Sequence, residues 1–162
     1  MSIDLNTRLA KFKDLVPSKV PFVEGKLKGH RDRLNYSVIG PGVSEDSKQN
    51  VKIAEAHGFN IGGVNAAPLN GSGLHSHTTA EVFLVYQGRW RFYWGVDGQD
   101  GEVFLNKGDV ASFPTNMFRG FQNVGTDRGL LFVALGEDDP GIITWTPKTL
   151  SAAKDTGMVL LD

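Results

Sequence analysis

The residues of this chain that could do chemistry gather in one short stretch. His75 and His77 are separated by a single residue, and Glu81 follows four residues after the second histidine. Side chains alternate between the two faces of an extended backbone, so residues separated by even numbers can point to one side. Two imidazoles and one carboxylate on one face form the ligand set of a facial-triad iron site, and the same set suits zinc, manganese or nickel. The spacing predicts a metal site, and a polar rim at a strand end is the alternative.

The overall composition excludes several other classes of protein. With 17 Lys+Arg against 18 Asp+Glu, the chain has no electrostatic basis for binding nucleic acid or an anionic membrane. The absence of cysteine excludes disulfides and thiolate metal sites, and it fits a reducing compartment. The first residues lack the pattern of a signal peptide, and no apolar run reaches the length of a membrane span. We therefore expect a cytoplasmic protein whose partner is a small molecule.

One basic stretch, residues 26–33, stands out from this balanced composition. It places Lys26, Lys28, Arg31 and Arg33 around a glycine and a histidine. Runs of charge usually form a solvated surface, so the stretch predicts an exposed loop or an edge strand protected by its charges. A binding patch is the alternative.

The elements that must position the histidines and the glutamate are predicted to be short strands. Apolar or alternating runs recur between glycine, proline and asparagine, which predicts strands near 51–57, 59–67, 74–77, 81–87, 89–95, 102–105, 110–113, 118–123 and 129–135. The chain has 20 glycines, a share that fits a backbone with many sharp turns. Many short strands at regular spacing indicate an all-β sandwich or barrel.

Both ends of the chain are predicted to carry a short helix. Residues 4–16 have apolar residues at helical spacing before Pro17, and residues 149–157 read as a helix that Gly157 ends. The apolar tail at 158–161 needs cover, either from the barrel or from a second subunit, and the second choice predicts a homodimer. No repeat or linker divides the chain, so residues 1–162 are expected to form one domain with a barrel core at about 51–135.

The region around the histidines resembles the first motif of the cupin superfamily. That motif is a glycine, five residues, His-x-His, three or four residues, a glutamate, six residues and a glycine. His75, His77, Glu81 and Gly88 match it with that spacing, whereas Leu69 stands at the position of the opening glycine. The resemblance implies a double-stranded β-helix, the jelly-roll barrel of this superfamily, here with short N- and C-terminal helices.

The second motif of the same superfamily is present in part. It consists of a glycine, five residues, Pro-x-Gly, two residues, a histidine, three residues and an asparagine. Gly108, Pro114 and Asn123 match, whereas Asn116 replaces the second glycine and Arg119 replaces the histidine. Because both motifs occur in order, the resemblance is specific for the fold.

The replacement by Arg119 matters most for function. In metal-binding members of the superfamily the residue at this position is the fourth protein ligand, and a guanidinium has no lone pair to offer a metal. Three protein ligands still suffice for a non-haem iron site with open positions. His57, which shares its strand phase with Ile53 and Glu55, is a candidate for a further ligand from a neighbouring strand.

Two interpretations of Arg119 stay open. In the first, Arg119 is a catalytic residue that anchors an acidic substrate and presents it to a metal on His75, His77 and Glu81. In the second, Arg119 forms a structural ion pair with Glu81, and the barrel holds no metal.

The resemblance alone does not give an activity, because the superfamily includes dioxygenases, isomerases, decarboxylases, lyases, storage proteins and ligand sensors. We expect a metal-dependent enzyme similar to the non-haem oxygenases, acting on a small acidic substrate. Trp90, Phe92 and Trp94 share one strand face, and if that face lines the cavity the substrate has an aromatic or apolar body. The alternative is a metal-free cupin that binds a small ligand as a sensor or accessory protein.

Overall fold

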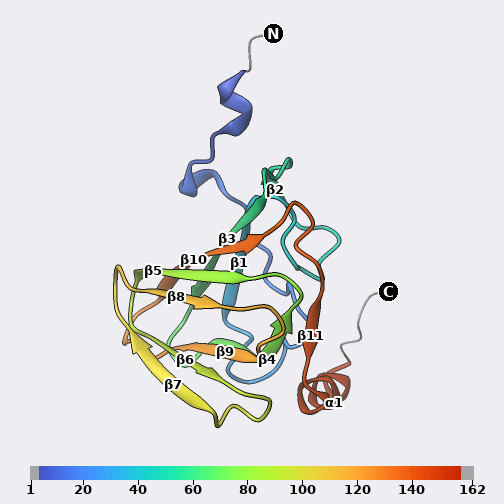
Figure 1. Cartoon of the computed structure of the whole chain (residues 1–162), viewed down its shortest axis with the longest axis vertical. Helices are drawn as coiled ribbons and strands as arrows, with labels where there is room; N and C mark the ends of the chain where they lie inside the picture. Colours follow the sequence, from blue (N-terminus) through green and yellow to red (C-terminus); the bar gives the residue numbers. More distant parts are fainter. Residues whose placement is uncertain (1–3, 158–162) are drawn as a thin grey trace.

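Two β-sheets packed face to face make up most of the molecule in the computed structural model, which describes residues 4–157 (Figure 1). The six-stranded sheet has the order β2-β1-β3-β10-β5-β8, and the five-stranded sheet has the order β11-β4-β9-β6-β7. The strands are β1 (Arg33–Ile39), β2 (Val51–Ile53), β3 (Phe59–Ala66), β4 (Gly71–His77), β5 (Glu81–Gln87), β6 (Trp90–Trp94), β7 (Gly101–Leu105), β8 (Val110–Phe113), β9 (Arg119–Asn123), β10 (Gly129–Gly136) and β11 (Ile143–Trp145). The expected barrel of short strands is confirmed.

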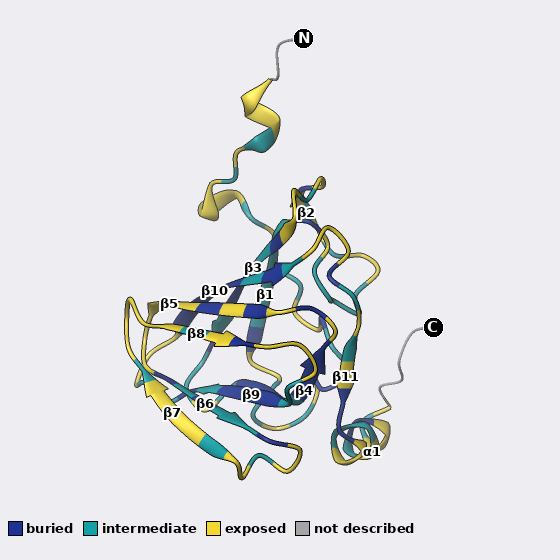
Figure 2. Ribbon diagram, in the orientation of Figure 1, coloured by how far each residue is buried: buried dark blue, intermediate teal, exposed yellow. Residues whose placement is uncertain are grey.

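The core of the barrel follows from the alternation of side chains along each strand. In β5 the residues Glu81, Phe83 and Val85 are buried, whereas Val82 and Leu84 are exposed (Figure 2). The same period of two sends one face of each strand toward the opposite sheet. The core cluster is rich in aromatic residues and contains Val64, Ala66, Phe83, Val85, Trp90, Phe92, Phe113, Phe121, Leu131 and Val133.

Two strands of the structure lie outside the predicted set, and both border the site described below. Strand β1 pairs with β3 in antiparallel fashion, and β11 pairs with β4 so that Trp145 lies opposite His75 and Ile143 opposite His77. The sequence patterns had predicted no strand over residues 33–39 or 143–145. Pairing with β3 makes β1 a strand, because a neighbouring strand satisfies its backbone groups.

The two ends of the chain differ from each other in how well the sequence predicted them. The predicted N-terminal helix at 4–16 is wrong: two 3₁₀ turns, η1 (Leu5–Arg8) and η2 (Phe12–Asp14), take its place. This segment extends away from the barrel (Figure 1), and Leu5 and Leu9 remain at least half exposed, so no apolar surface stabilises a full helix.

The C-terminal helix, in contrast, is confirmed as α1 (Pro147–Asp155). The side chain of Thr146 accepts a hydrogen bond from the backbone N–H of Thr149, and Gly157 follows the helix with a φ of 77°. The predicted apolar tail at 158–161 lies outside the described residues. Within residues 4–157, no helix is long and apolar enough to cross a membrane.

The two positions where the sequence departs from the motif glycines both have left-handed backbones. Leu69 has a φ of 63° and Asn116 has a φ of 62°. The N–H of Leu69 donates to the carbonyl of Asn123, and the N–H of Asn116 donates to the carbonyl of His77. Glycine adopts this conformation without steric cost, which explains why the motif has glycine at both positions. The motif alignment is therefore correct at the level of backbone conformation.

Replacing Leu69 by glycine is expected to stabilise the protein. The substitution Leu69→Gly removes the strain of a left-handed leucine but adds freedom to the unfolded chain, for a net gain of about 0.5 to 1 kcal/mol in the free energy of unfolding. Urea unfolding followed by circular dichroism measures this change. Ile142 is similarly exposed, at 68% against 65% for Leu69, but its φ is not left-handed, so Ile142→Gly should lower the stability. A loss of stability in Leu69→Gly would contradict the account of the motif.

Candidate metal centre

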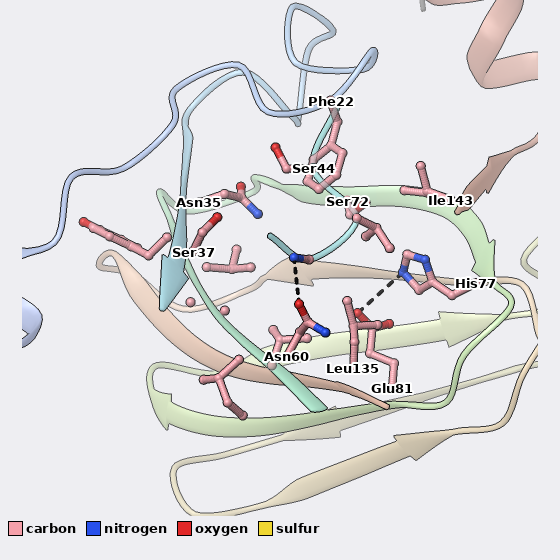
Figure 3. Close-up of a pocket in the computed structure, with 18 of the residues that line it drawn as sticks. Phe22, Asn35, Ser37, Ser44, Asn60, Ser72, His77, Glu81, Leu135 and Ile143 are labelled. Atoms are coloured by element: carbon pink, nitrogen blue, oxygen red, sulfur yellow. Dashed lines mark hydrogen bonds and ion pairs between the residues drawn. The ribbon is translucent and has the colours of Figure 1, made fainter. Parts of the chain in front are cut away.

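The fold gathers His75, His77 and Glu81 from two sheets rather than from one continuous strand. His75 and His77 occupy the end of β4 in the five-stranded sheet, and Glu81 begins β5 in the six-stranded sheet. A short turn at 78–80 carries the chain across the barrel between them. The inward faces of the two strands meet, so the even spacing in the sequence still places all three side chains on the inside. Figure 3 shows His77 and Glu81 facing each other there.

The geometry of these three residues fits a metal ion. All three are buried, and one potential ligand atom from each lies within 4.8 Å of the others. The His77 Nε2 and the Glu81 Oε1 are 3.6 Å apart, too far for a hydrogen bond. Two atoms that bind one zinc ion at the usual lengths lie about 3.0 to 3.4 Å apart, so the pair formed by His77 and Glu81 would need only a small contraction.

The hydrogen bonds of the two imidazoles also suit ligand roles. The Nδ1 of His75 lies 2.7 Å from the carbonyl oxygen of Gly73, so it carries the proton and leaves Nε2 as a free lone pair. The Nδ1 of His77 is buried without a hydrogen-bond partner among the described residues. The other nitrogen of His77, Nε2, faces Glu81 at 3.6 Å and makes no hydrogen bond within the described chain, so Nε2 is the atom that could bind a metal.

The protonation states of His75 and Glu81 are those that metal binding requires. Burial lowers the pKa of His75 to about 3, helped by the nearby His77 and Arg119, so the imidazole is neutral at physiological pH. Burial alone would raise the pKa of Glu81, but His77, Arg119 and His75 outweigh it and lower that pKa to about 2. A neutral imidazole and an ionised carboxylate are ready to bind a cation without losing a proton.

The structure places Arg119 behind Glu81 and away from the cavity. Its Nε and Nη2 lie 2.9 and 2.5 Å from the Glu81 Oε2, and its Nη1 donates to the carbonyl of Met117. Arg119 is fully buried and does not line the cavity. The expected role of Arg119 as a substrate anchor is therefore corrected: its guanidinium is used to hold Glu81, as in the ion-pair interpretation.

His57 is not part of the cluster. It lies in an exposed bend between β2 and β3, where its Nδ1 is 3.3 Å from the Arg8 Nη2. The sequence had suggested a ligand on a neighbouring strand, but β2 ends at Ile53, so the strand phase does not extend to His57. The predicted role of His57 as a further metal ligand is therefore wrong.

A cavity opens beside the cluster between the two sheets (Figure 3). It encloses about 660 Å³ of empty space including its open mouth, and His75, His77 and Glu81 line it. Its walls are otherwise mainly apolar, with Phe22, Phe83, Phe121, Ile61, Val64, Val133, Leu135 and Ile143 among the lining residues. Trp90 and Phe92 are instead buried in the core and do not line the cavity, so the condition on which they would favour an aromatic or apolar substrate is not met.

Sequence reasoning missed a second buried ion pair at the same cavity. Arg33 is 2% exposed, and its Nη1 lies 2.8 Å from the Oε1 of Glu24, which is fully buried. The basic stretch at 26–33 is thus not a wholly solvated surface, because its last residue points inward. The signal was present in Arg33, Asn35 and Ser37, whose even spacing is typical of one strand face.

Comparison with known proteins supports the barrel and its motifs. Residues 64–135 match the family model of the cupin domain. Putative germin-like protein 2-3 from Oryza sativa subsp. japonica is 31% identical over 103 residues, which cover 58% of this chain and 46% of the relative. Germin-like protein subfamily 1 member 10 from Arabidopsis thaliana is 27% identical over 120 residues, which cover 72% and 54%. The chain thus spans about half the length of these relatives.

Solved structures show the same architecture at low sequence identity. An uncharacterized conserved protein with a double-stranded β-helix domain from Klebsiella pneumoniae has a TM-score of 0.61 at 15% identity, with 90% of this chain and 97% of that chain covered. Oxalate decarboxylase from Lactobacillus farciminis has a TM-score of 0.58 at 16% identity, with 86% and 36% covered. The two-sheet architecture, the motif positions and the matched family model together show that the barrel of this chain is a cupin domain.

Proposed function

We propose that this protein is a metal-dependent enzyme that binds one divalent ion through His75, His77 and Glu81 and acts on a small organic acid in the adjoining cavity. The observation that carries the proposal is the buried ligand cluster on the wall of an apolar cavity. Cupin domains serve many functions, so the proposal rests on this site and not on the fold.

The pairing of Arg119 with Glu81 is compatible with a metal ion. Both hydrogen bonds that the guanidinium donates to Glu81 reach Oε2, whereas Oε1 faces His77. Glu81 can therefore keep its bond to Arg119 through one oxygen and bind the ion through the other. Arg119 then acts as a positioning residue, because it fixes the rotamer of Glu81 and keeps the carboxylate ionised.

The charge of the site favours an acidic substrate. Arg119 neutralises Glu81, and the two imidazoles are without charge when they bind a metal, so the ion would keep most of its positive charge. A carboxylate or enolate in the cavity would compensate it. Three protein ligands leave coordination positions open, and such a centre supplies Lewis-acid chemistry or, with iron, the oxygen chemistry of the non-haem oxygenases.

The second candidate is a metal-free cupin that binds a small ligand as a sensor or accessory protein. The observation that favours it is the same ion pair, because Arg119 satisfies Glu81 in the absence of a cation. This candidate gives the Nε2 of the buried His77 no hydrogen bond, because that atom lies 3.6 Å from the Glu81 oxygen it faces, whereas a metal ion would bind both atoms. For that reason we place the metal-dependent enzyme first.

Metal loading tests the proposal directly. The protein, dialysed against a chelator and then reconstituted anaerobically with iron(II) or with zinc, should bind about one ion per chain. The variant His77→Ala should lose this binding while its circular dichroism stays that of the wild type, because His77 lies at the wall of a cavity. Elemental analysis after gel filtration provides the stoichiometry. The exposed histidine provides the matched control, since His57→Ala should load like the wild type. Loading that survives in His77→Ala would place the ion elsewhere.

Two substitutions of Arg119 separate the effect of its positive charge on metal binding from the effect of the missing fourth ligand. Arg119 lies directly opposite His75 in the pairing of β4 with β9, so an imidazole there is placed to become a fourth ligand. We expect Arg119→His to bind zinc at least about tenfold more tightly, because it adds a ligand and removes a positive charge. Arg119→Gln removes the charge alone and should show a smaller gain. Both variants should be less stable without metal, because Glu81 loses its buried partner.

Chelator competition measures the zinc affinity of the three proteins, and thermal unfolding measures their stability without metal. Equal or weaker zinc affinity in Arg119→His would mean that the position does not face the ion. In that case the centre proposed for His75, His77 and Glu81 would need a different arrangement.

A further inference from the structure

We propose that Arg33 is the substrate anchor of this site, binding a carboxylate of the ligand through the edge of its guanidinium formed by Nε and Nη2. The proposal deepens the proposed function and rests on it in one respect, namely that the cavity beside His75, His77 and Glu81 is the substrate site. Nothing in the motif resemblance points to Arg33, because it lies before both motifs.

The two buried arginines of the barrel differ in what their guanidinium edges bind. In Arg119 the Nε and Nη2 atoms both donate to the Oε2 of Glu81, and the residue does not line the cavity. In Arg33 the same two atoms are buried and have no hydrogen-bond partner within residues 4–157, and the residue does line the cavity. Nε and Nη2 form the edge that matches the two oxygens of a carboxylate. Arg33 therefore keeps unpaired, in a residue beside the cavity, the donor pair that Arg119 has already used.

The rest of the Arg33 guanidinium is fixed by the protein. Its Nη1 lies 2.8 Å from the Glu24 Oε1 and 2.7 Å from the carbonyl oxygen of Gly71. The ring of Phe22 covers its face, with the guanidinium carbon 5.1 Å from the ring centroid. The structural role of Arg33 is complete with these contacts, and it leaves two buried donors over. Unpaired buried donors cost free energy unless a ligand or water satisfies them.

A chain of hydrogen bonds ties Arg33 to the proposed metal ligands. The hydroxyl of Ser72 donates to the same Glu24 oxygen that binds Arg33, at 2.9 Å, and lies 3.2 Å from the His75 Nδ1. The second Glu24 oxygen accepts from the N–H of Gly73, and the Gly73 carbonyl binds His75. One buried carboxylate thus holds both the anchor and a metal ligand. This arrangement fixes their relative position, as a site that orients a substrate requires.

The inner face of β1 extends the polar side of the cavity. Arg33, Asn35 and Ser37 alternate along the strand and all three line the cavity, where Figure 3 shows Asn35 and Ser37. The Oδ1 of Asn35 is also buried without a hydrogen-bond partner within the described chain, whereas the Ser37 hydroxyl is bound by Gln49. Next to the anchor there is therefore an acceptor for one donor group of the ligand.

These contacts define the class of ligand. Its carboxylate binds Arg33, its body contacts the apolar wall that includes Phe83, Phe121 and Leu135, and a second polar group reaches the cluster of His75, His77 and Glu81. A small monocarboxylic acid with an apolar or aromatic body meets the first two requirements, so the anchor can be tested with simple acids.

The experiment compares acids with their neutral amides on the full chain. Benzoate, phenylacetate, benzamide and phenylacetamide are titrated by calorimetry into metal-free protein and into zinc-loaded protein. We expect the acids to bind the wild type at least about tenfold more tightly than the amides, because only the acids form charge-assisted hydrogen bonds with Arg33. Arg33→Lys keeps a positive charge for Glu24 but lacks the bidentate edge, and it should bind the acids about tenfold more weakly with little change for the amides.

Further variants test whether any arginine-to-lysine substitution weakens acid binding and replace Arg33→Lys if it does not fold. Arg91 is an exposed arginine that pairs with Glu102, so Arg91→Lys should bind the acids like the wild type. If Arg33→Lys fails to fold, the double variant Glu24→Gln with Arg33→Met takes its place, because it leaves no buried charge unpaired. That variant should lose the preference for acids over amides.

The outcomes separate the anchor from the metal centre. Acid binding that Arg33→Lys weakens, together with zinc stoichiometry equal to that of the wild type, supports the anchor. Acid binding of this kind in a protein that binds no metal also supports the anchor while the metal proposal fails. Equal binding of acids by the wild type and Arg33→Lys, equal binding of acids and amides, or no binding of any acid would each overturn the anchor.

Discussion

The burial of charge inside the barrel is the constraint on which the rest of the structure depends. Glu81 and Glu24 are both withdrawn from water, and each is paired with a buried arginine, Arg119 and Arg33 respectively. Burying an isolated carboxylate would cost a large amount of free energy, so each pair stabilises the folded barrel. The pairs leave specific atoms over: one oxygen of Glu81, and one edge of Arg33. These remaining atoms are the ones to which our proposals assign metal and ligand binding.

The jelly-roll topology explains why the polar atoms meet in one place. Strands β4 and β5 are consecutive in the chain but belong to opposite sheets, so the turn between them carries Glu81 across the barrel to face His77. Strand β1 lies in the same sheet as β5 and brings Arg33 to the cavity from a distant part of the sequence. The aromatic core around Phe83, Phe92 and Phe121 fills the neighbouring part of the barrel, and the cavity lies beside it.

Local patterns predicted the central strands and the clustering of His75, His77 and Glu81, because both depend on spacing within one or two strands. The positions of Leu69 and Asn116 could be aligned with motif glycines, and the structure explains the alignment by their left-handed backbones. Sequence patterns could not assign the partners of the two arginines. Arg33 finds Glu24 in a preceding turn, and Arg119 finds Glu81 in the opposite sheet, so both contacts depend on tertiary packing. The prediction of an N-terminal helix was wrong for the opposite reason. The helical spacing was present, but no apolar surface covers Leu5 or Leu9.

The central claim is that His75, His77 and Glu81 bind one metal ion while Arg119 keeps its contact with Glu81. A crystal structure of zinc-loaded protein, with anomalous diffraction recorded on both sides of the zinc absorption edge, tests this claim most directly. The account predicts one anomalous peak per chain within bonding distance of the two imidazoles and of Oε1 of Glu81, with Oε2 still bound to Arg119. The absence of a peak at this cluster, or a peak formed only after Glu81 has left Arg119, would contradict it.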